Sequence, residues 1–435
     1  MTGGIIIGAP KSGSGKTMIT AALLRHLRQR GIRVAAAKCG PDYIDPTFHT
    51  LAAGHPCINL DPWAMRPTTL SALVQELERS AELVLCEGVM GLFDGAGPDG
   101  ETGSTAELAR LTGWPVVLVV DAGGQGASVA ALVAGFAHHD SRVPLAGVIL
   151  NRVASPHHRA LLSDAIARHL PGLPVLGAVL GDESLEAPAR HLGLVPAGEA
   201  GDIDARLDSA AVKIAKACDI DAFTALAKPA RCGAGSPSPT LPPLGQHIAV
   251  ARDTAFLFTY EAALAGWRRQ GAAVSFFSPL ADEAPAAAAD AVYLPGGYPE
   301  LHAGRLASAA NFLGVLRRPD KTIYGECGGY MVLGQTLTDA EGVTHRMAGL
   351  LPLKTNFAER RRHLGYRSAR LLASGPLGGK GARFRGHEFH YAAIVEETGD
   401  PLFAIADASG NDLGRVGLRQ GSTFGSFIHL IDAES

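Results

Sequence analysis

A glycine-rich turn near the start of the chain constrains the fold more than any other feature. The run "GAPKSGSGKT", Gly8 to Thr17, follows the apolar residues "GGIII" and precedes "MITAALLRHL", where apolar residues recur at helical spacing until Gly31. A strand, a glycine turn and a helix in this order are typical of a loop that holds phosphate at a helix N-terminus. The sequence therefore predicts a parallel α/β sheet with an anion site beside its first strand. The alternative is a turn that only joins strand to helix.

The turn carries the groups that a nucleotide phosphate site needs. It matches the pattern G-x-x-x-x-G-K-[ST] except at Pro10, which stands where the first glycine is expected. Glycine N–H groups can turn toward phosphate oxygens, the final lysine can reach the β and γ phosphates, and the threonine hydroxyl can bind Mg²⁺. An asparagine that ends a later strand either reads a purine or caps the strand. The predicted nucleotide-binding residues are Lys11, Gly13, Ser14, Gly15, Lys16, Thr17 and Asn151.

Carboxylates that follow predicted strands are the candidate ligands of the metal ion. Mg²⁺ prefers oxygen ligands and is usually held through one or two carboxylates. Glu87 follows the apolar run "LVLC" and precedes Asp94, while "GPDYIDP" places Asp42 and Asp45 after the second strand. At each position a carboxylate exposed on a loop is the alternative. Asp121, which ends "VVLVVD", is compatible with a strand-end cap and with a ligand. The predicted metal ligands are Thr17, Asp45 and Glu87.

Short apolar runs alternate with helical patterns along almost the whole chain. They include "RVAAAKC", "ELVLCEG" and "PVVLVVDA" in the first half and "HIAVARD", "AAVSFFSP" and "DAVYLPGG" in the second. Such alternation favours doubly wound parallel sheets. A chain of 435 residues exceeds one core, since domains average about 150 residues, and a Pro-, Gly- and Ser-rich stretch interrupts the pattern. We predict two α/β domains, 1–228 and 247–435, joined by a linker at 229–246.

The overall charge and the cysteine pattern exclude several classes of protein. A net charge of −3 and a pI near 6.6 give no general attraction to nucleic acid or to an anionic membrane. The chain has neither a signal-peptide pattern at its start nor an apolar run of the roughly 18 residues that a membrane span needs. Its six cysteines form no C-x-x-C pair, so no disulfide framework is expected. We expect a cytoplasmic protein.

The cysteine at position 327 has a neighbourhood unlike that of the others. In "TIYGECGGYM" it follows an apolar strand, lies between glycines and precedes a helix-compatible segment, which is the form of a nucleophile elbow. A helix N-terminus is expected to lower the pKa of the Cys327 thiol and to supply oxyanion donors. Gly297, after another strand, can supply a further donor, and His429 on the apolar run "TFGSFIHL" is the candidate base. The alternatives are an inert buried cysteine and a structural histidine.

These motifs together resemble one family of enzymes. The stretches "KSGSGKT", "GPDYIDPTFH", "CEGVMGLFDG", "GVILNRV", "LPGGYPE", "GECGGYM" and "GHEFHY" are similar to those of cobyrinate and hydrogenobyrinate a,c-diamide synthases, the ATP-dependent glutamine amidotransferases of corrinoid biosynthesis. The resemblance runs nearly from end to end of the chain. It implies a dethiobiotin-synthetase-like P-loop domain followed by a class I glutaminase domain with a flavodoxin-like sheet. It also implies a homodimer.

The resemblance further implies a division of labour among the residues. Cys327 would attack the glutamine amide, His429 would shuttle protons, and the Gly297 and Gly328 N–H groups would hold the oxyanion. In the first domain, a carboxylate of the corrinoid substrate would attack the γ-phosphate of MgATP, and ammonia would displace phosphate from the acyl phosphate. The implied catalytic or metal-binding carboxylates are Asp45, Glu87 and Asp94, with Lys38, Asp42 and Tyr43 as the implied substrate-binding residues.

The chain departs from the pattern of triad glutaminases near its end. Ile431 stands where those enzymes have a glutamate two residues after the histidine, and Asp432 would point to the other side of the strand. We therefore predict a Cys–His dyad in which Glu388 or a backbone carbonyl orients the imidazole. Met331 replaces a glutamine that usually lines the glutamine pocket. The arginines of "ERRRHLGYR" are either a solvated charge run or contacts for an acidic ring: Arg360, Arg361, Arg362 and Arg367.

Two other functions remain compatible with the sequence. A related tetrapyrrole such as nickel-sirohydrochlorin can replace the corrin ring in an enzyme of the same family. A partition-type nucleotide switch also uses the lysine-rich phosphate loop, but such a switch has no need of the cysteine elbow. Cobalt-free and cobalt-containing rings are equally compatible with the residues.

Overall fold

The protein is described by a computed structural model that covers residues 2–97, 100–182, 185, 189–190, 193–194, 202–233, 240–318, 320–359 and 361–434. The described chain divides into two compact units. The first unit comprises Met1–Trp63 and Pro67–Ser238, and the second comprises Ala64–Arg66 and Pro239–Ser435.

The first unit is built on a seven-stranded parallel sheet with the strand order β3-β2-β4-β1-β5-β6-β7. Its strands are β1 (Gly3–Gly8), β2 (Val34–Cys39), β3 (Ile58–Leu60), β4 (Leu83–Glu87), β5 (Val116–Asp121), β6 (Leu145–Val153) and β7 (Val175–Leu180). A two-stranded ladder, β8 (Ala189–Arg190) with β9 (Gly193–Leu194), is separate from this sheet. The predicted strands of this half are present, whereas the short edge strand β3 and the β8–β9 ladder were not predicted.

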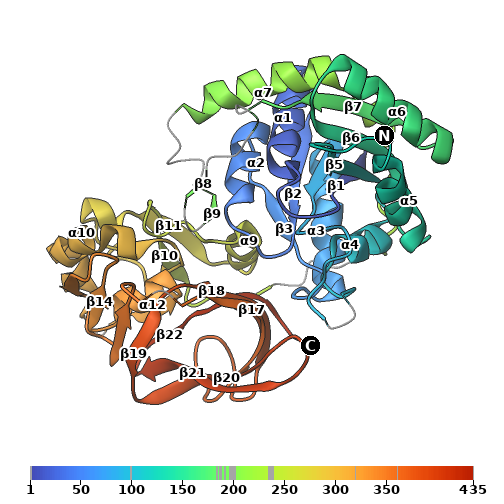
Figure 1. The fold of residues 1–435 in the computed structure, drawn as a ribbon. Helices are drawn as coiled ribbons and strands as arrows, with labels where there is room; N and C mark the ends of the chain where they lie inside the picture. The colour runs from blue at the N-terminus through green and yellow to red at the C-terminus, as the bar shows by residue number, and fades with distance from the viewer. Residues whose placement is uncertain are drawn as a thin grey trace. The chain divides into compact units, whose positions relative to one another are not determined.

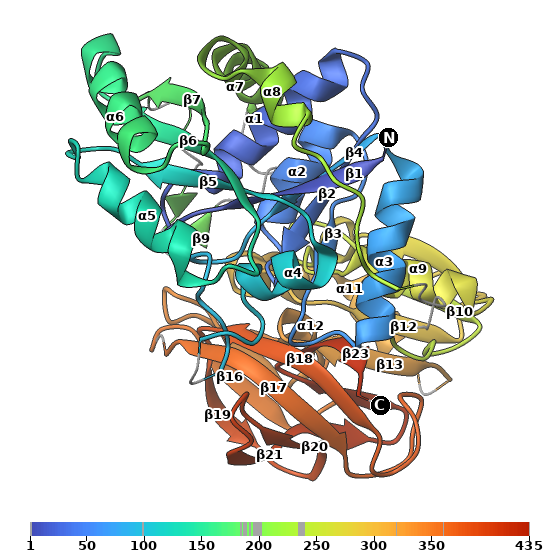
Figure 2. The same cartoon turned by 90° about the vertical axis from the view of Figure 1, so that its right-hand side faces the viewer.

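Helices cover both faces of this sheet, as expected for a doubly wound fold (Figure 1). They are α1 (Lys16–Gln29), α2 (Asp45–Ala53), α3 (Pro67–Ser80), α4 (Thr105–Thr112), α5 (Val129–His139), α6 (Pro156–His169), α7 (Ile203–Ala217) and α8 (Ile220–Thr224). Helix α1 packs against α2 and α7, while α5 packs against α6, and Figure 2 shows α6 beside β6 and β7.

The core of the first unit follows from the apolar runs of the sequence. All six residues of β1 and of β2 are buried, as expected for strands covered on both faces. At Gly4 the indole of Trp114 lies so close that a Cβ would overlap it, which explains a glycine inside a central strand. Because β1, β2 and β4 are parallel neighbours, the phosphate loop, Lys38 and Glu87 are brought to the same edge of the sheet.

The second unit contains a parallel sheet of flavodoxin type. Numbered along the chain, its parallel strands follow the order 2-1-3-4-5, namely β11-β10-β12-β13-β22. These strands are β10 (His247–Ala251), β11 (Ala273–Phe277), β12 (Ala291–Leu294), β13 (Thr322–Glu326) and β22 (Thr423–Ser426). The predicted fold class, two doubly wound α/β units with a flavodoxin-like second sheet, is confirmed.

An antiparallel extension continues this sheet through β21-β20-β17-β18-β23. Its strands are β17 (His363–Leu371), β18 (Arg383–His390), β20 (Asp400–Ala406), β21 (Asp412–Gln420) and β23 (Ile428–Ala433), with the long strands visible in Figure 2. Only Phe427 separates β22 from β23, although four strands lie between them in the sheet order. The extension must therefore curl until its last strand returns beside β22. The sequence did not predict this extension.

A separate four-stranded sheet and several short helices complete the second unit. The sheet consists of β14 (Thr336–Thr338), β15 (Thr344–Arg346), β16 (Leu353–Asn356) and β19 (Ala393–Glu397). The helices are α9 (Glu261–Arg269), α10 (Ala303–Ser308), α11 (Ala310–Leu316) and α12 (Gly328–Leu333), with 3₁₀ turns η3 (Pro279–Ala281) and η4 (Pro299–His302). Ala309 separates α10 from α11, because its backbone ψ of 76° is not helical.

The predicted linker, 229–246, is hydrogen-bonded on both sides of residues 234–239, which are not among the described residues. The Arg231 N–H donates to the Thr112 carbonyl in the first unit. In the second unit the indole of Trp267 donates to the Pro242 carbonyl. Among the helices described, none is both long and apolar enough to cross a membrane.

Candidate functional site

The phosphate loop of the first unit has the backbone that its glycines predict. Gly13 and Gly15 have positive φ angles of 77° and 93°, a region that favours glycine. The side chain of Asn151, on β6, donates from Nδ2 to the Ser14 carbonyl at 2.9 Å. A Cβ on Gly15 would overlap that amide group, so the loop and Asn151 are mutually fitted. In this state the asparagine amide supports the loop. Lys11 is exposed beside it.

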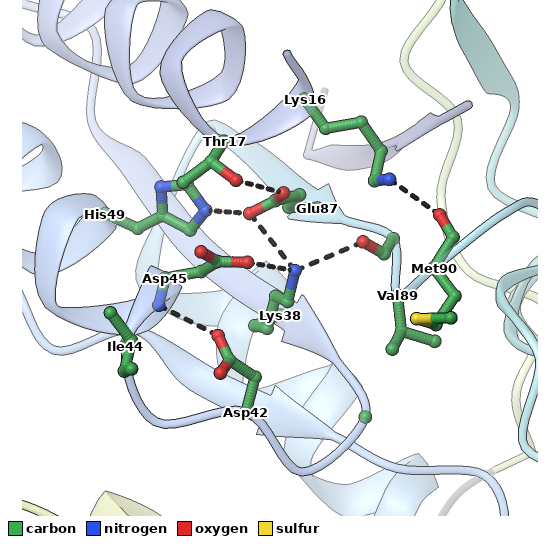
Figure 3. A network of polar contacts seen from close by, with 12 residues as sticks. Lys16, Thr17, Lys38, Asp42, Ile44, Asp45, His49, Glu87, Val89 and Met90 are labelled. Carbon is green, nitrogen blue, oxygen red and sulfur yellow. Dashed lines mark hydrogen bonds and ion pairs between the residues drawn. The ribbon is translucent and has the colours of Figure 1, made fainter. Parts of the chain in front are cut away.

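Lys16 begins helix α1 and reaches across the loop. Its Nζ donates to the Met90 carbonyl at 2.6 Å, in the segment that follows β4 (Figure 3). Burial lowers the pKa of Lys16, and the carboxylate of Glu87 opposes this shift. Met90 itself has a positive φ of 47°, an unusual conformation for a side chain of this size. A buried lysine bonded to a backbone carbonyl is a donor that an incoming phosphate group can recruit.

A network of buried charged groups lies beside this lysine (Figure 3). Lys38 on β2 contacts Asp45 Oδ2 at 2.6 Å and Glu87 Oε2 at 3.3 Å. Glu87 ends β4, and its Oε1 accepts from the Thr17 hydroxyl at 2.9 Å. Its Oε2 lies 2.6 Å from Nε2 of His49. The structure therefore brings together Lys38, Asp45, Glu87 and Thr17, which the sequence placed on four separate segments.

The charges in this network determine one another's protonation. Burial alone would lower the pKa of Lys38, but the carboxylates of Asp45 and Glu87 outweigh burial and raise it. Burial opposes ionisation of Glu87, yet Lys38 and the hydrogen bond from His49 lower the pKa of Glu87 to about 2. The pKa of Asp45 is raised, first by burial and then by Glu87. A charged lysine and an ionised Glu87 are thus the stable pair.

The donor set at this edge fits a magnesium ion. The hydroxyl of Thr17 and the carboxylates of Asp45 and Glu87 supply oxygen atoms, the ligand type that Mg²⁺ prefers. Thr17 is already hydrogen-bonded to Glu87, and both carboxylates contact the Lys38 ammonium, so these side chains already hold a positive charge between them. Thr17 lies at the end of the phosphate loop, in the first turn of α1, where a nucleotide-bound metal would need a protein ligand.

The other predicted carboxylates of the first unit have structural contacts. Asp42 accepts from the Asp45 N–H at 2.8 Å and so caps the start of helix α2, and burial together with Asp45 raises its pKa to about 7. Asp94 is exposed and accepts from the Gly91 N–H at 2.8 Å. Asp121 accepts from the Gly123 N–H and pairs with Arg152 at 2.7 Å, which favours the cap over the ligand. Tyr43 is half-buried.

In the second unit, Cys327 stands on a sharp turn between β13 and α12. Its φ of 47° and ψ of −103° lie outside the regions that side-chain-bearing residues usually adopt. The Cys327 N–H donates to the Ser426 carbonyl on β22 at 2.8 Å, and the Gly329 N–H donates to the Pro295 carbonyl at 3.1 Å. These bonds hold the turn in place. The geometry agrees with a nucleophile elbow.

Glycines surround this elbow at close quarters. A Cβ on Gly328 would lie 3.0 Å from the nitrogen of Gly297, so the two predicted oxyanion donors come from adjacent backbones. A Cβ on Gly297 would overlap the Ala255 carbonyl. The ring of His429 lies directly against Gly296, since a Cβ there would overlap its Cε1 atom. The structure thus gathers the candidate nucleophile, the oxyanion donors and the base.

The expected activation of the thiol by the helix N-terminus is wrong for this state. Burial raises the pKa of the Cys327 thiol far above its usual range, and the hydrogen bond from the Gly328 N–H only partly offsets it. Burial also lowers the pKa of His429, with His387 and His390 adding to the effect. His429 stacks on His387 with ring centroids 4.8 Å apart. The resting pair is therefore a neutral thiol and a neutral imidazole.

Glu388, the carboxylate proposed to orient His429, and Asp432, expected to point away from it, are both bound to other groups. Glu388 pairs with Arg367 at 2.8 Å through Oε2 and with His390 Nε2 at 2.9 Å through Oε1. Asp432 is fully buried and accepts from Arg66, whose Nη2 lies 2.7 Å from Oδ1. Glu388 is therefore not the orienting group, which corrects that expectation, and Asp432 points away as predicted.

The arginine-rich stretch does not form one uniform surface. Arg360 lies outside the described residues, and Arg361 and Arg362 are exposed. Arg367 is held in the ion pair with Glu388, in which both side chains are only 12% and 14% exposed. Arg367 is therefore a structural partner rather than part of a solvated charge run.

Sequence reasoning missed two buried residues that touch the candidate groups. His49 follows Asp45 by four positions on helix α2, so helical spacing placed both on one face and the signal was available. Glu326 is a carboxylate at the end of an otherwise uncharged strand run, "TIYGE", directly before the nucleophile. Its 3.9 Å approach to His429 Nδ1 depends on tertiary structure.

Comparison with known proteins identifies both units. Residues 5–195 match the CobQ/CobB/MinD/ParA nucleotide binding domain, which implies use of ATP, and residues 247–435 match the CobB/CobQ-like glutamine amidotransferase domain. A solved glutamine amidotransferase from Thermotoga maritima covers 42% of this chain and 75% of its own at 14% identity, with a TM-score of 0.29, too low to carry an argument.

Curated relatives match almost the whole chain. A hydrogenobyrinate a,c-diamide synthase of Rhizobium meliloti is 53% identical over 437 residues, covering 99% of both chains. One of Brucella abortus is 55% identical over 437 residues, covering 99% of this chain and 98% of its own. The resemblance drawn from the motifs is thereby confirmed, and the chain belongs to the hydrogenobyrinate a,c-diamide synthase family of glutamine amidotransferases.

Proposed function

We propose that this chain uses ATP and glutamine to amidate the a- and c-side-chain carboxylates of a corrin ring in cobalamin biosynthesis. The full-length identity to hydrogenobyrinate a,c-diamide synthases carries this proposal and favours the cobalt-free ring, hydrogenobyrinic acid. A partition-type switch is disfavoured, because it would not need a buried cysteine elbow with adjacent oxyanion donors.

The second unit would release ammonia from glutamine. His429 takes the proton of the Cys327 thiol, the sulfur attacks the side-chain amide, and the Gly297 and Gly328 N–H groups stabilise the oxyanion. The protonated His429 then gives its proton to the leaving nitrogen. Water hydrolyses the thioester, which yields glutamate and restores the thiol.

The first unit would activate the carboxylate of the ring. The carboxylate oxygen attacks the γ-phosphorus of ATP, ADP leaves, and the resulting acyl phosphate reacts with ammonia to give an amide and inorganic phosphate. Lys16 would leave the Met90 carbonyl to bind the phosphate oxygens, and the loop N–H groups would hold the remaining phosphates. Lys38 would hold the carboxylates of Asp45 and Glu87 in place through its two ion pairs.

Magnesium would be held by Thr17, Asp45 and Glu87, and when bound it neutralises charge on the transferred phosphoryl group. We assign residues 1–228 to the amide synthase domain, 229–246 to the linker and 247–435 to the glutaminase domain. Asp94 would act with the catalytic carboxylates, and Lys38, Asp42 and Tyr43 would lie beside the ring substrate. Lys11, Gly13, Ser14, Gly15 and Asn151 complete the nucleotide site.

We also propose a homodimer that works in the cytoplasm, where ATP and glutamine are supplied.

An assay of both macrocycles tests the proposal. The purified chain is incubated with MgATP and glutamine plus either hydrogenobyrinic acid or cobyrinic acid, and products are resolved by mass. We expect a diamide from hydrogenobyrinic acid, formed through a monoamide, and dependence on both ATP and glutamine. Amidation of neither ring would contradict the corrin assignment, and nickel-sirohydrochlorin, incubated in the same way, would then test the related substrate.

A further inference from the structure

We propose that Glu326, the residue directly before the nucleophile, is the positioning residue that orients the imidazole of His429. This inference rests on the proposed glutaminase activity of the second unit. It would supply the acid that triad glutaminases carry two residues after the histidine, where this chain has Ile431. Glu326 would thus act as the third member of a Cys–His–acid triad, although it lies on β13 and not on β23, the strand of His429.

The carboxylate of Glu326 reaches the strand that carries the base at two points. Its Oε2 lies 3.9 Å from Nδ1 of His429, and its Oε1 accepts from the Leu430 N–H at 3.2 Å. Glu326 and His429 are 2% and 1% exposed, so solvent screens their interaction little. The side chain thus acts on the ring and on the backbone that presents the ring.

Two tyrosines fix the carboxylate in this place. Tyr293 on β12 donates its hydroxyl to Oε2 at 2.7 Å, and Tyr324 on β13 donates to Oε1 at 2.8 Å. The two phenol rings are stacked with centroids 5.7 Å apart. Together with the Leu430 amide, three donors hold the two oxygen atoms, so the carboxylate cannot swing away from the imidazole. Such locking of an orienting group is what precise catalytic geometry requires.

The separation of 3.9 Å is too long for a hydrogen bond in the resting state. Catalysis changes this, because the imidazole becomes positively charged when it takes the thiol proton. A buried imidazolium is costly without a nearby negative charge, and catalytic hydrogen bonds often tighten only when the reacting complex forms. Glu326 then stabilises the Nδ1–H side of the ring while Nε2 faces the reaction.

Other groups near His429 have contacts of their own. His387 on β18 stacks on the ring and receives a contact from Tyr260, whose hydroxyl lies 3.2 Å from its Nδ1. Glu388 is paired with Arg367 and His390, and Cys327 lies on the same turn as Glu326. Glu326, by contrast, lies at ion-pair distance from His429, with its Oε2 3.9 Å from Nδ1.

The test compares Glu326→Gln with a double variant, Tyr293→Phe with Tyr324→Phe. The glutamine-dependent reaction is measured as kcat and as KM for glutamine, and the ammonia-dependent reaction is measured in parallel. For Glu326→Gln we expect kcat to fall about 10²- to 10³-fold, while KM for glutamine changes less than about threefold and the ammonia-dependent rate is kept. The double variant should lose less than about tenfold, because it keeps the carboxylate.

Several outcomes would overturn the inference. A change in kcat below about threefold for Glu326→Gln would do so, as would an equal loss in the double variant, since the glutamate would then serve only to anchor the tyrosines. If Glu326→Gln does not fold, Glu326→Asp carries the test: kcat should fall about tenfold with KM unchanged, and an unchanged kcat would contradict the role. If Cys327→Ala keeps glutamine use, the proposed function itself fails.

Discussion

Lys38 in the first unit and Cys327 in the second are both buried near the carboxyl end of a strand in a parallel sheet. Their electrostatic surroundings, however, are opposite. Lys38 lies between two carboxylates that raise its pKa, so this site is charged at rest. Cys327 lies in surroundings that raise its pKa by burial, and the nearby His429 is kept neutral by the same effect. The first site is prepared for a polyanion, whereas the second creates charge only during reaction.

This difference has a physical reason. ATP arrives with its charge, so the protein can balance it in advance with fixed cations and ligands. Glutamine is a neutral amide at its reacting end, and a permanent thiolate would be exposed to oxidation and to other electrophiles. A neutral Cys–His pair becomes reactive only when the oxyanion donors have a substrate to hold. Four substitutions test the two halves of this comparison.

The largest effect is expected for Cys327→Ala. Without the sulfur nucleophile, glutamine-dependent amidation should fall by about 10⁴-fold or more, while amidation from free ammonia should remain near the wild-type rate. Both rates are measured with the same MgATP and ring substrate. Cys232→Ala, at a half-buried cysteine outside the elbow, is the matched control. Equal loss from both nitrogen sources would contradict a separate glutaminase site.

The next largest effect is expected for Lys16→Ala, which tests the phosphate site of the first unit. Lys16→Ala removes the cation that the phosphate loop offers, so amidation from glutamine and from ammonia should fall together by about 10²- to 10³-fold. Hydrolysis of glutamine alone is the internal control, since it does not require transfer of phosphate. Continued amidation from ammonia in this variant would sink the assignment of the phosphate site.

A smaller effect is expected where a buried histidine supports a carboxylate. His49 holds Glu87 through a 2.6 Å contact, so His49→Asn should raise the magnesium concentration needed for half-maximal ammonia-dependent activity by about tenfold. The exposed His55 provides a matched control, His55→Asn, which should leave the magnesium requirement unchanged. An unchanged requirement in His49→Asn would remove Glu87 from the proposed metal ligands.

The sequence predicted the first site better than the second. Carboxyl ends of adjacent parallel strands meet at one edge, so the convergence of Lys38 and Glu87 followed from identifying β2 and β4. The network around them, including His49, is local to the same helices and strands. Apolar periodicity likewise predicted both parallel sheets, which the structure confirms.

The second site depends on contacts that no local pattern reports. The antiparallel extension brings β18 and β23 against the elbow, and this pairing determines which carboxylate approaches His429. Glu388, suggested by its motif, proved to be paired with Arg367. The predicted lowering of the Cys327 pKa was wrong, because the effect of burial is larger than that of the helix N-terminus. Burial is a property of the assembled unit and not of the local sequence.

The fourth prediction concerns stability and pH. Burial raises the pKa of Glu326 from its ordinary value of 4.5 to about 7, although three hydrogen-bond donors oppose the shift. The folded protein therefore binds this proton more tightly than the unfolded chain. The resulting stabilisation is fully present below pH 4.5 and is lost as the pH rises through 7. From the size of the shift, the loss is about 3 kcal/mol between these limits.

Glu326→Gln should remove this dependence. Urea unfolding of both proteins is followed at pH 5.5 and pH 8, and the difference between them at each pH cancels the contributions of other groups. The variant loses a hydrogen bond at both pH values, so it should be less stable than wild type at pH 5.5. The difference in free energy of unfolding between the two proteins should narrow by about 2 kcal/mol at pH 8. A gap that does not change with pH would mean that Glu326 titrates alike in both states. The pKa of Glu326 would then stay near its ordinary value of 4.5 in the folded protein, and burial would not control its charge.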